Sequence, residues 1–325
     1  MKNNDMLWSC LLHLGTNMWR DKEAPPQVDD KYFRPNSSGT MWNDNAYFDV
    51  DVFHKITEKL PEMGINTVLI DIGDGIRYDS HPEIGVNGAM TPDELRGEVR
   101  RLRALGLEPV PKLNFASSHD AWLGEYERML STKTYYNVIS DLIHEVCEIF
   151  EKPKYFHLGM DEEAAENQAA YGYSVIRAEP VWFRDFYHMV ACCERENARP
   201  WIWSDYYWHH KEAFKKMMPK SVLQSNWHYW ALSGENGEKG VHAFSYRAFF
   251  DLEELGYDQV PTTTTWSTTG NTYQVVSQLA AHKMKNIHGF MTAPWMMTDE
   301  VSYYDILGDI ARLGFARREF GDCFE

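Results

Sequence analysis

Short apolar runs alternate with longer amphipathic stretches along most of the chain. The apolar runs are rich in β-branched and aromatic residues, which is typical of strands covered on both faces. The amphipathic stretches repeat apolar residues at helical spacing. The expected strands cover residues 7–14, 66–72, 107–113, 154–159, 199–204, 222–226, 259–265 and 287–293. The expected helices cover residues 52–63, 92–105, 135–150, 180–196, a short stretch near 213, 242–255, 272–283 and 302–315.

This alternation predicts parallel strands joined by right-handed crossovers. Eight such units close into a barrel, so the expected fold is α/β, a (β/α)₈ TIM barrel. The main rival is a doubly wound open sheet, but no glycine-rich phosphate loop follows any expected strand. Without a linker or a shift in composition, residues 1–325 are expected to form one catalytic domain. An extended loop at about 21–47 is expected to lie over the barrel mouth.

Charge and composition narrow the classes of partner. The net charge is −16, from 32 Lys and Arg against 48 Asp and Glu, which disfavours nucleic acid and anionic membranes. No apolar stretch reaches transmembrane length, and the first residues lack a signal-peptide cleavage pattern, so a cytoplasmic location is expected. The five cysteines show no metal spacing and indicate free, buried thiols. No metal or cofactor is expected, and the oligomeric state stays open.

Candidate chemistry gathers where the expected strands end, which is where a (β/α)₈ barrel places its active site. Carboxylates, histidines and aromatics dominate these positions. In chain order they are Arg20, Asp71, Asp74, Asn114, His119, His157, Asp161, Glu162, Glu163, Asp205, Tyr206, Trp208, Trp227, His228, Trp230, Trp266, Trp295, Asp299 and Glu300. The chain also holds 12 Trp and 18 Tyr, whose flat faces and polar edges suit a carbohydrate substrate.

Asp161 and Glu162 are the strongest catalytic candidates. Cleavage of a glycosidic bond needs a proton donor for the leaving oxygen and negative charge near the oxocarbenium-like centre. Two consecutive carboxylates at a strand end supply both, and their repulsion raises the pKa of at least one. The alternative is that Asp161, Glu162 and Glu163 only stabilise a helix N-terminus. The local sequence leaves both interpretations open, and Glu163 is expected to face solvent or cap the following helix.

Residues 157–162, with the sequence HLGMDE, resemble the H-x-G-x-D-E signature of family 20 glycoside hydrolases, the β-N-acetylhexosaminidases. Residues 107–119 (LEPVPKLNFASSH) resemble the family's third-strand segment, which ends in Pro-Gly-His. Residues 71–77 (DIGDGIR) resemble its second-strand Asp-Asp-Gln-Gly-Trp-Arg loop. Residues 295–300 resemble its terminal Trp-x-Glu region. The matching segments follow the family's order from the second strand to the eighth.

The resemblance implies a retaining, exo-acting β-N-acetylhexosaminidase with substrate-assisted catalysis. Glu162 would be the general acid/base, and Asp161 would orient the substrate's 2-acetamido group as it attacks the anomeric carbon. His119, backed by Asp74, would tune Glu162. The substrate-binding residues would be Arg20 at the ring hydroxyls, Trp203, Trp227, Trp266 and Trp295 as walls, Tyr229 at the acetamido carbonyl, and His157, Asp205 and Glu300 around them.

The sequence departs from the family pattern at four places, one of which is a shortened second-strand loop that leaves the choice of Asp74 over Asp71 open. Lys112-Leu113-Asn114 replaces Glu-Ile-Asp, and Ser117-Ser118-His119 replaces Pro-Gly-His. A threonine run, 262–265, stands where the family has a Tyr and an Asp. The sugar and linkage therefore stay open. Two alternatives are a non-hydrolytic carbohydrate-binding barrel and a two-carboxylate glycosidase that pairs Glu162 with a distant acid such as Glu300.

Overall fold

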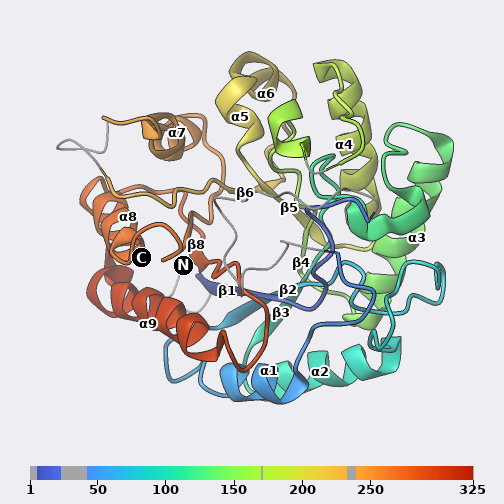
Figure 1. The fold of residues 1–325 in the computed structure, drawn as a ribbon. Coiled ribbons are helices and arrows are strands. Elements are labelled where there is room, and N and C mark those ends of the chain that lie inside the picture. Colours follow the sequence, from blue (N-terminus) through green and yellow to red (C-terminus); the bar gives the residue numbers. More distant parts are fainter. Residues whose placement is uncertain (1–5, 23–41, 170, 233–238, 325) are drawn as a thin grey trace.

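The computed structural model describes residues 6–22, 42–169, 171–232 and 239–324, in which strands and helices alternate (Figure 1). The strands are β1 (Leu7–His13), β2 (Thr67–Asp71), β3 (Glu108–Lys112), β4 (Tyr155–His157), β5 (Arg199–Trp203), β6 (Leu223–Ser225), β7 (Thr262–Thr263) and β8 (Gly289–Thr292). The α-helices are α1 (Val50–Thr57), α2 (Pro92–Ala104), α3 (Lys133–Ile149), α4 (Glu179–Arg195), α5 (Tyr206–His209), α6 (Lys211–Met217), α7 (Ala243–Glu254), α8 (Asn271–Ala281) and α9 (Tyr303–Phe320). Short 3₁₀ helices cover η1 (Ala121–Tyr126), η2 (Ala165–Gln168) and η3 (Gly321–Phe324).

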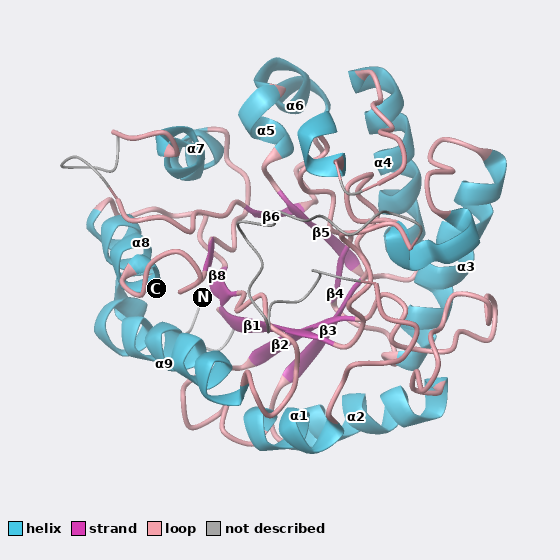
Figure 2. Cartoon of the chain, viewed as in Figure 1, coloured by secondary structure: helices cyan, strands magenta, loops and turns pink. Residues whose placement is uncertain are grey.

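All strand pairs are parallel, and the sheet order is β6-β5-β4-β3-β2-β1-β8-β7. Parallel bridges from Gln224 to Gln259 and from Trp227 to Thr262 join the two ends of this order. The strands therefore form a ring, and the helices lie outside it (Figure 2). The predicted (β/α)₈ barrel is confirmed, and the open doubly wound sheet is excluded because its edge strands would remain unpaired.

Helix boundaries follow the local caps. Thr91 and Glu94 form a reciprocal capping box at the start of α2, and the Asp49 carboxylate caps α1 by accepting from two backbone N–H groups. The helix expected over 52–63 ends instead at Thr57, and residues 58–63 form turns. Pro61 explains the early end, because proline lacks an N–H donor and disfavours helical geometry at the residue before it.

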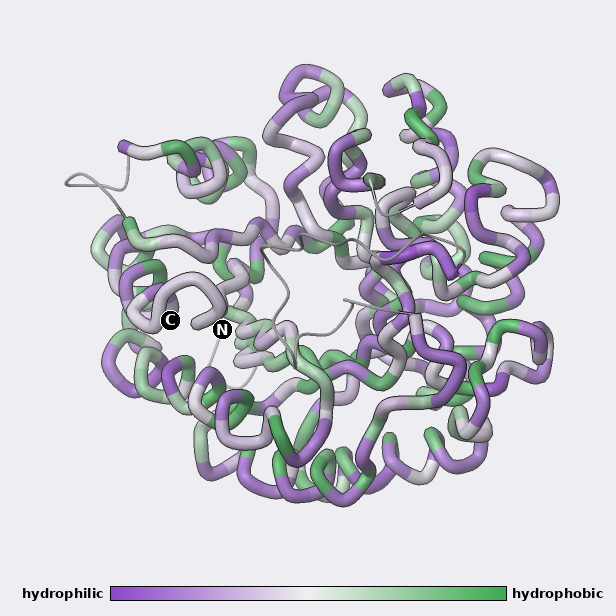
Figure 3. Tube along the Cα trace, viewed as in Figure 1, coloured by the Kyte–Doolittle hydropathy of each residue, from purple (hydrophilic) through white to green (hydrophobic). Residues whose placement is uncertain are grey.

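Two apolar layers hold the barrel together. The larger layer lies between the strands and the helices, where α3 contributes Val138, Leu142, Ile143 and Val146. Hydrophilic and hydrophobic positions alternate along the outer helices, as amphipathic helices require (Figure 3). The smaller layer fills the barrel interior with side chains such as Leu11, Leu69, Val110 and Trp201. The interior is thus a packed core beneath the barrel mouth.

A row of polar residues crosses four neighbouring strands at their C-terminal ends. His13, Asp71, Lys112 and His157 occupy register-matched positions on β1 to β4. The Lys112 ammonium donates to the Asp71 carboxylate at 2.6 Å, and both side chains are fully buried. The His13 Nδ1 atom lies 3.4 Å from the same carboxylate. The buried Lys112–Asp71 ion pair therefore lies directly beneath the barrel mouth.

Most of the predicted loop at about 21–47 lies outside the described residues. All five cysteines are free, and four of them are buried, as the sequence predicts. Cys323 is exposed. Among the described residues, no helix is both long enough and apolar enough to cross a membrane.

Candidate active site

The chain makes an unusual turn as it leaves β4. Gly159, Met160 and Glu162 all have left-handed backbones, with φ of 71°, 74° and 54°. A Cβ at position 159 would lie 2.0 Å from the Asn114 side-chain oxygen, so only glycine fits there. The Glu162 N–H donates to the Asp205 carboxyl at 2.7 Å, which ties this turn to the end of β5. The turn therefore presents Asp161 and Glu162 at the barrel mouth.

His119 brings the two acids together. Its Nε2 atom lies 3.3 Å from an Asp161 oxygen and 3.2 Å from a Glu162 oxygen. The imidazole and the Asp161 carboxylate are buried, while about a third of the Glu162 side chain, 36%, is exposed. A partly exposed acid beside a buried one suits a pair in which one group exchanges protons and the other stays fixed.

Electrostatics separate the roles of these groups. Burial disfavours a charged His119, but the Asp161 and Glu162 carboxylates outweigh it and raise the pKa of His119 to about 10. Burial alone would raise the pKa of Asp161, yet the His119 imidazolium and the Lys112 ammonium lower it to about 2. At neutral pH the cluster therefore contains a cationic imidazole beside an ionised Asp161.

Asn114 fixes the other side of Asp161. Its amide N–H donates to an Asp161 oxygen at 2.9 Å, and its carbonyl oxygen accepts from the Met160 N–H at 3.3 Å. The Ser118 hydroxyl donates to the Asp161 backbone carbonyl at 3.0 Å. The altered third-strand segment therefore supplies contacts to the acid pair. Asn114 stands at the end of the third strand as a departure from the family pattern, and no role was predicted for it.

Asp205 is a second buried acid beside this cluster. It accepts from the Glu162 N–H and, at 3.2 Å, from the Trp227 indole N–H. Burial and then the negative charge of Asp161 raise the pKa of Asp205 well above its usual range. Asp205, predicted to bind substrate, thus contacts the backbone of the predicted acid/base.

Aromatic rings lie beside this cluster at the barrel mouth. Trp203 lies between His157 and Trp295, with ring-centre distances of 4.6 Å and 5.9 Å. Trp227 stacks on Tyr229 at 4.9 Å. Burial, and to a smaller extent the negative charges of Asp161, Glu162 and Asp205, raise the pKa of the Tyr229 phenol well above its usual range. The phenol therefore stays a hydrogen-bond donor. Burial and Lys112 hold the pKa of His157 well below its usual range, which leaves this ring neutral.

Trp19 lies beside the site, although no sequence pattern indicated it. Its ring centre lies 6.0 Å from that of His119 and 6.4 Å from that of Trp295. Trp19 thereby joins the acid cluster to the aromatic wall from the loop after β1. Arg20, the next residue, is half-buried on the same loop, and Trp266 is half-buried after β7.

Two predicted site residues lie apart from the cluster. Asp74 accepts from the Asn17 side chain at 2.6 Å, and burial raises its pKa to about 6. No contact between Asp74 and His119 occurs among the described residues, so the expected relay is not part of this geometry. Glu300 is exposed and pairs with Lys55 on α1 rather than with the acids of the mouth.

The same cluster contains the atoms that a metal ion would need. Donor atoms of His119, Asp161 and Glu162 all lie within 4.8 Å of one another. A histidine that binds a metal usually donates its other ring N–H to an acceptor. Among the described residues the His119 Nδ1 atom has no such partner. The arrangement fits proton handling between carboxylates better than metal ligation.

The fold and this mouth define a (β/α)₈ barrel with a carboxylate–histidine cluster beside a group of aromatic rings. Neither protein-family models nor curated proteins match the sequence. Solved structures do match the fold, and they are family 20 β-N-acetylhexosaminidase catalytic modules.

Three of these structures illustrate the likeness. A catalytic module of the pneumococcal exo-β-D-N-acetylglucosaminidase StrH is 14% identical, with 98% of this chain and 86% of that chain covered and a TM-score of 0.61. An exo-β-N-acetylglucosaminidase from Vibrio harveyi is 12% identical, with coverages of 98% and 58% and a TM-score of 0.62. A β-N-acetylhexosaminidase from Streptomyces coelicolor is 13% identical, with coverages of 95% and 64% and a TM-score of 0.60. At such identities the likeness establishes the fold alone.

Proposed function

We propose that this chain is a glycoside hydrolase that removes terminal β-linked N-acetylhexosamine with retention of configuration. The observation that carries the proposal is the position of His119, 3.3 Å from Asp161 and 3.2 Å from Glu162. These contacts hold two consecutive acids together at the mouth, beside rings of a kind suited to a pyranose. The fold likeness to family 20 modules supports the same class of reaction.

In the first step, the 2-acetamido oxygen of the sugar would attack the anomeric carbon. Glu162 would give its proton to the glycosidic oxygen, and that oxygen would leave with the electron pair of the broken bond. Asp161, ionised at neutral pH because its pKa is about 2, would accept a hydrogen bond from the acetamido N–H and stabilise the oxazolinium ion.

In the second step, water would attack the anomeric carbon and reopen the oxazolinium ring. The Glu162 carboxylate would take the proton from that water and return to its acid form. The two displacements at one carbon give net retention, and the substrate supplies the nucleophile. No second protein carboxylate is needed at the opposite face of the sugar.

The direct test is hydrolysis of aryl β-N-acetylglucosaminide and aryl β-N-acetylgalactosaminide by the wild type and by Glu162→Gln. The variant should lose about 10²–10⁴-fold in kcat, because it cannot donate the proton. Glu166→Gln is the matched control, since Glu166 is a nearby exposed acid and its loss should leave kcat unchanged. Equal activity of Glu162→Gln and wild type would end the assignment.

A thiazoline that mimics the oxazolinium ion separates the substrate-assisted route from a two-carboxylate route. Only an enzyme that stabilises this intermediate should bind the mimic far more tightly than the substrate. Retained sugar binding by the wild type, with no product from either aryl substrate, would favour the non-hydrolytic barrel.

A further inference from the structure

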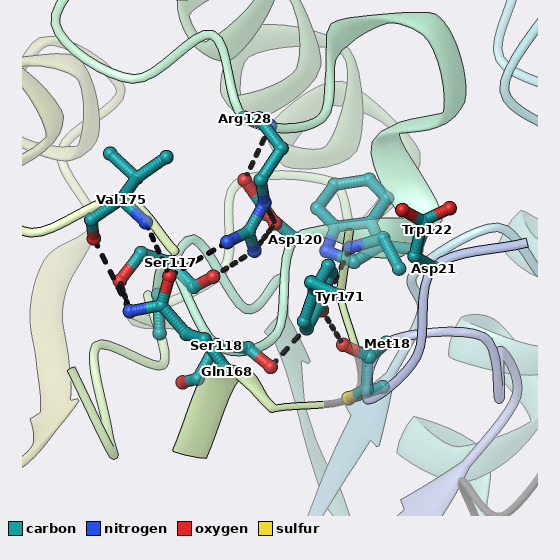
Figure 4. Close-up of polar contacts among 12 residues, drawn as sticks. Met18, Asp21, Ser117, Ser118, Asp120, Trp122, Arg128, Gln168, Tyr171 and Val175 are labelled. Carbon is teal, nitrogen blue, oxygen red and sulfur yellow. Dashed lines mark hydrogen bonds and ion pairs between the residues drawn. The ribbon is translucent and has the colours of Figure 1, made fainter. Parts of the chain in front are cut away.

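The loop that carries His119 is closed on itself by one arginine. Arg128 contacts the Ser117 carbonyl oxygen and the Asp120 carboxylate through its guanidinium. Its backbone N–H donates to the other Asp120 oxygen at 2.9 Å. Arg128 itself has a left-handed backbone, with φ of 61°. Residues on both sides of His119 are therefore held by the same side chain (Figure 4).

Arg128 also joins this loop to the loop after β4. Its guanidinium donates to the Gln168 side-chain oxygen at 2.8 Å. The Gln168 amide donates to the Ser117 hydroxyl at 3.1 Å and to the Val175 carbonyl at 3.2 Å, and the Val175 N–H donates back at 2.7 Å. The loops after β3 and β4, which carry His119 and the two acids, thus share one buried set of hydrogen bonds.

Tyr171 adds the loop after β1. The Arg128 guanidinium lies 3.8 Å from the centre of its ring, a cation–π contact. The Tyr171 hydroxyl lies 2.6 Å from the Met18 carbonyl oxygen and 3.0 Å from the Ser118 carbonyl oxygen, and shares its proton between them. It accepts from the Ala121 N–H at 3.3 Å. Figure 4 shows Tyr171 between Met18 and Ser118.

We propose that Arg128 and Tyr171 are positioning residues, which clamp the three loops of the mouth so that His119 stays between Asp161 and Glu162. The Arg128 clamp, meaning Arg128 and Tyr171 with Asp120 and Gln168, holds residues 117, 118, 120 and 121, which flank His119 on both sides. Among the described residues, no member of the clamp forms a hydrogen bond or ion pair with the side chain of Asp161 or Glu162. The role in catalysis rests on the function proposed above.

The composition of the Arg128 clamp indicates that it fixes the positions of side chains more than it raises the stability of the fold. All four side chains are buried, Asp120 completely. A buried ion pair often stabilises a fold no better than apolar residues of the same volume, whereas its geometry is specific. A fully satisfied polar network of this kind holds its members in one arrangement. Such an arrangement matters here because His119 must stay within about 3 Å of two separate carboxylates.

The test replaces Tyr171 with Phe, which keeps the ring under Arg128 and removes the hydroxyl bridge. We expect kcat on aryl N-acetylhexosaminides to fall about 10- to 100-fold with little change in KM, the effect of a small displacement in an active site. We also expect the His119 imidazole to titrate at lower pH in ¹⁵N NMR spectra, because it moves away from its carboxylates. Arg128→Lys should show the same two changes, because one ammonium cannot reach all three acceptors.

Tyr257→Phe is the matched control. Tyr257 is also buried, donates to the Met218 carbonyl at 3.1 Å and lies 3.2 Å under the Lys220 ammonium, but its loop is not at the mouth. This variant should lose thermal stability comparably and leave both kcat and the His119 titration unchanged. If Tyr171→Phe behaves like Tyr257→Phe, the clamp is structural and the proposal is overturned. If the wild type hydrolyses no glycoside, the proposed function fails, and the His119 titration alone still decides the clamp.

Discussion

The two sides of the barrel mouth are held in different ways. On the polar side, made of Asn114, His119, Asp161 and Glu162, hydrogen bonds and charge contacts position each group. The aromatic side consists of Trp203, Trp227, Tyr229 and Trp295. Its side chains are positioned mainly by ring–ring packing. Among the described residues, buried ring nitrogens without a hydrogen-bond partner occur on both sides: those of His119 on the polar side, and those of Trp203, Trp295 and the neighbouring His157 (Nε2) on the aromatic side.

This difference indicates that the two sides of the mouth contribute to different steps, one to catalysis and the other to sugar binding. On the polar side, the Asp161 carboxylate and the Glu162 backbone are held by hydrogen bonds without a ligand, which is the preorganisation that electrostatic catalysis needs. The aromatic side contains polar ring edges without a protein partner among the described residues, a feature that suits a hydroxylated ligand. Changes on the polar side should therefore act on kcat, and changes on the aromatic side should act on sugar affinity and stability.

After that of Glu162→Gln, the largest expected effect is that of Asp161→Asn. The amide keeps the shape but removes the charge that stabilises a developing oxazolinium, so kcat should fall about 10²–10³-fold. Steady-state kinetics on an aryl β-N-acetylglucosaminide measure this loss. A fall confined to KM would place Asp161 among the ordinary binding groups and remove the distinction between the two sides.

The next prediction concerns the charge contacts of His119 on the polar side, which should make the unfolding free energy depend on pH. Its pKa is raised from 6.5 to about 10 in the folded protein, so the cation stabilises the fold fully below pH 6.5. That contribution should fade as the pH rises from 6.5 to 10, because the unfolded chain no longer holds the proton while the folded one does. Urea unfolding of wild type and His119→Gln should therefore give a difference in unfolding free energy that shrinks with pH. A constant difference would contradict the charge contacts.

Much of the fold could be predicted from the sequence because strand and helix periodicities differ clearly. All eight strands were found in their expected places, although β7 keeps only Thr262 and Thr263. The end of α1 was missed, because the apolar spacing continues past Thr57 while Pro61 interrupts the backbone. Periodicity reports which face is buried, not where the hydrogen bonds stop.

The site was predictable only where strand ends carry distinctive residues. Asp161, Glu162 and His119 follow this rule and lie together. Glu163 does not. It was expected to face solvent or cap a helix, but its side chain is buried and pairs at 2.6 Å with Arg177, which in turn pairs with Asp185. Such partners come from distant loop positions that no local spacing indicates.

On the aromatic side, Trp203→Phe should have a mixed and smaller effect. The smaller ring leaves a void beside His157 and Trp295, which should cost about 1–3 kcal/mol in unfolding free energy. We expect kcat to change less than about tenfold, since no charge is removed. Urea unfolding together with kcat and KM measures both parts. A loss of kcat as large as that of Asp161→Asn would show that the two sides are not separate in function.

The smallest expected effect is that of Glu300→Gln, which decides between the two glycosidase mechanisms. A two-carboxylate glycosidase would place its second acid about 5–10 Å from Glu162, across the sugar. Glu300 is instead exposed and paired with Lys55 on α1, outside both sides of the mouth. Removing such an exposed surface pair should leave the unfolding free energy nearly unchanged, because solvent screens it. Because Glu300 contacts neither His119 nor Asp161 in this geometry, kcat and KM should match the wild type. A loss beyond about 100-fold would mean that Glu300 reaches the sugar, and the nucleophile would then be a protein carboxylate rather than the acetamido group.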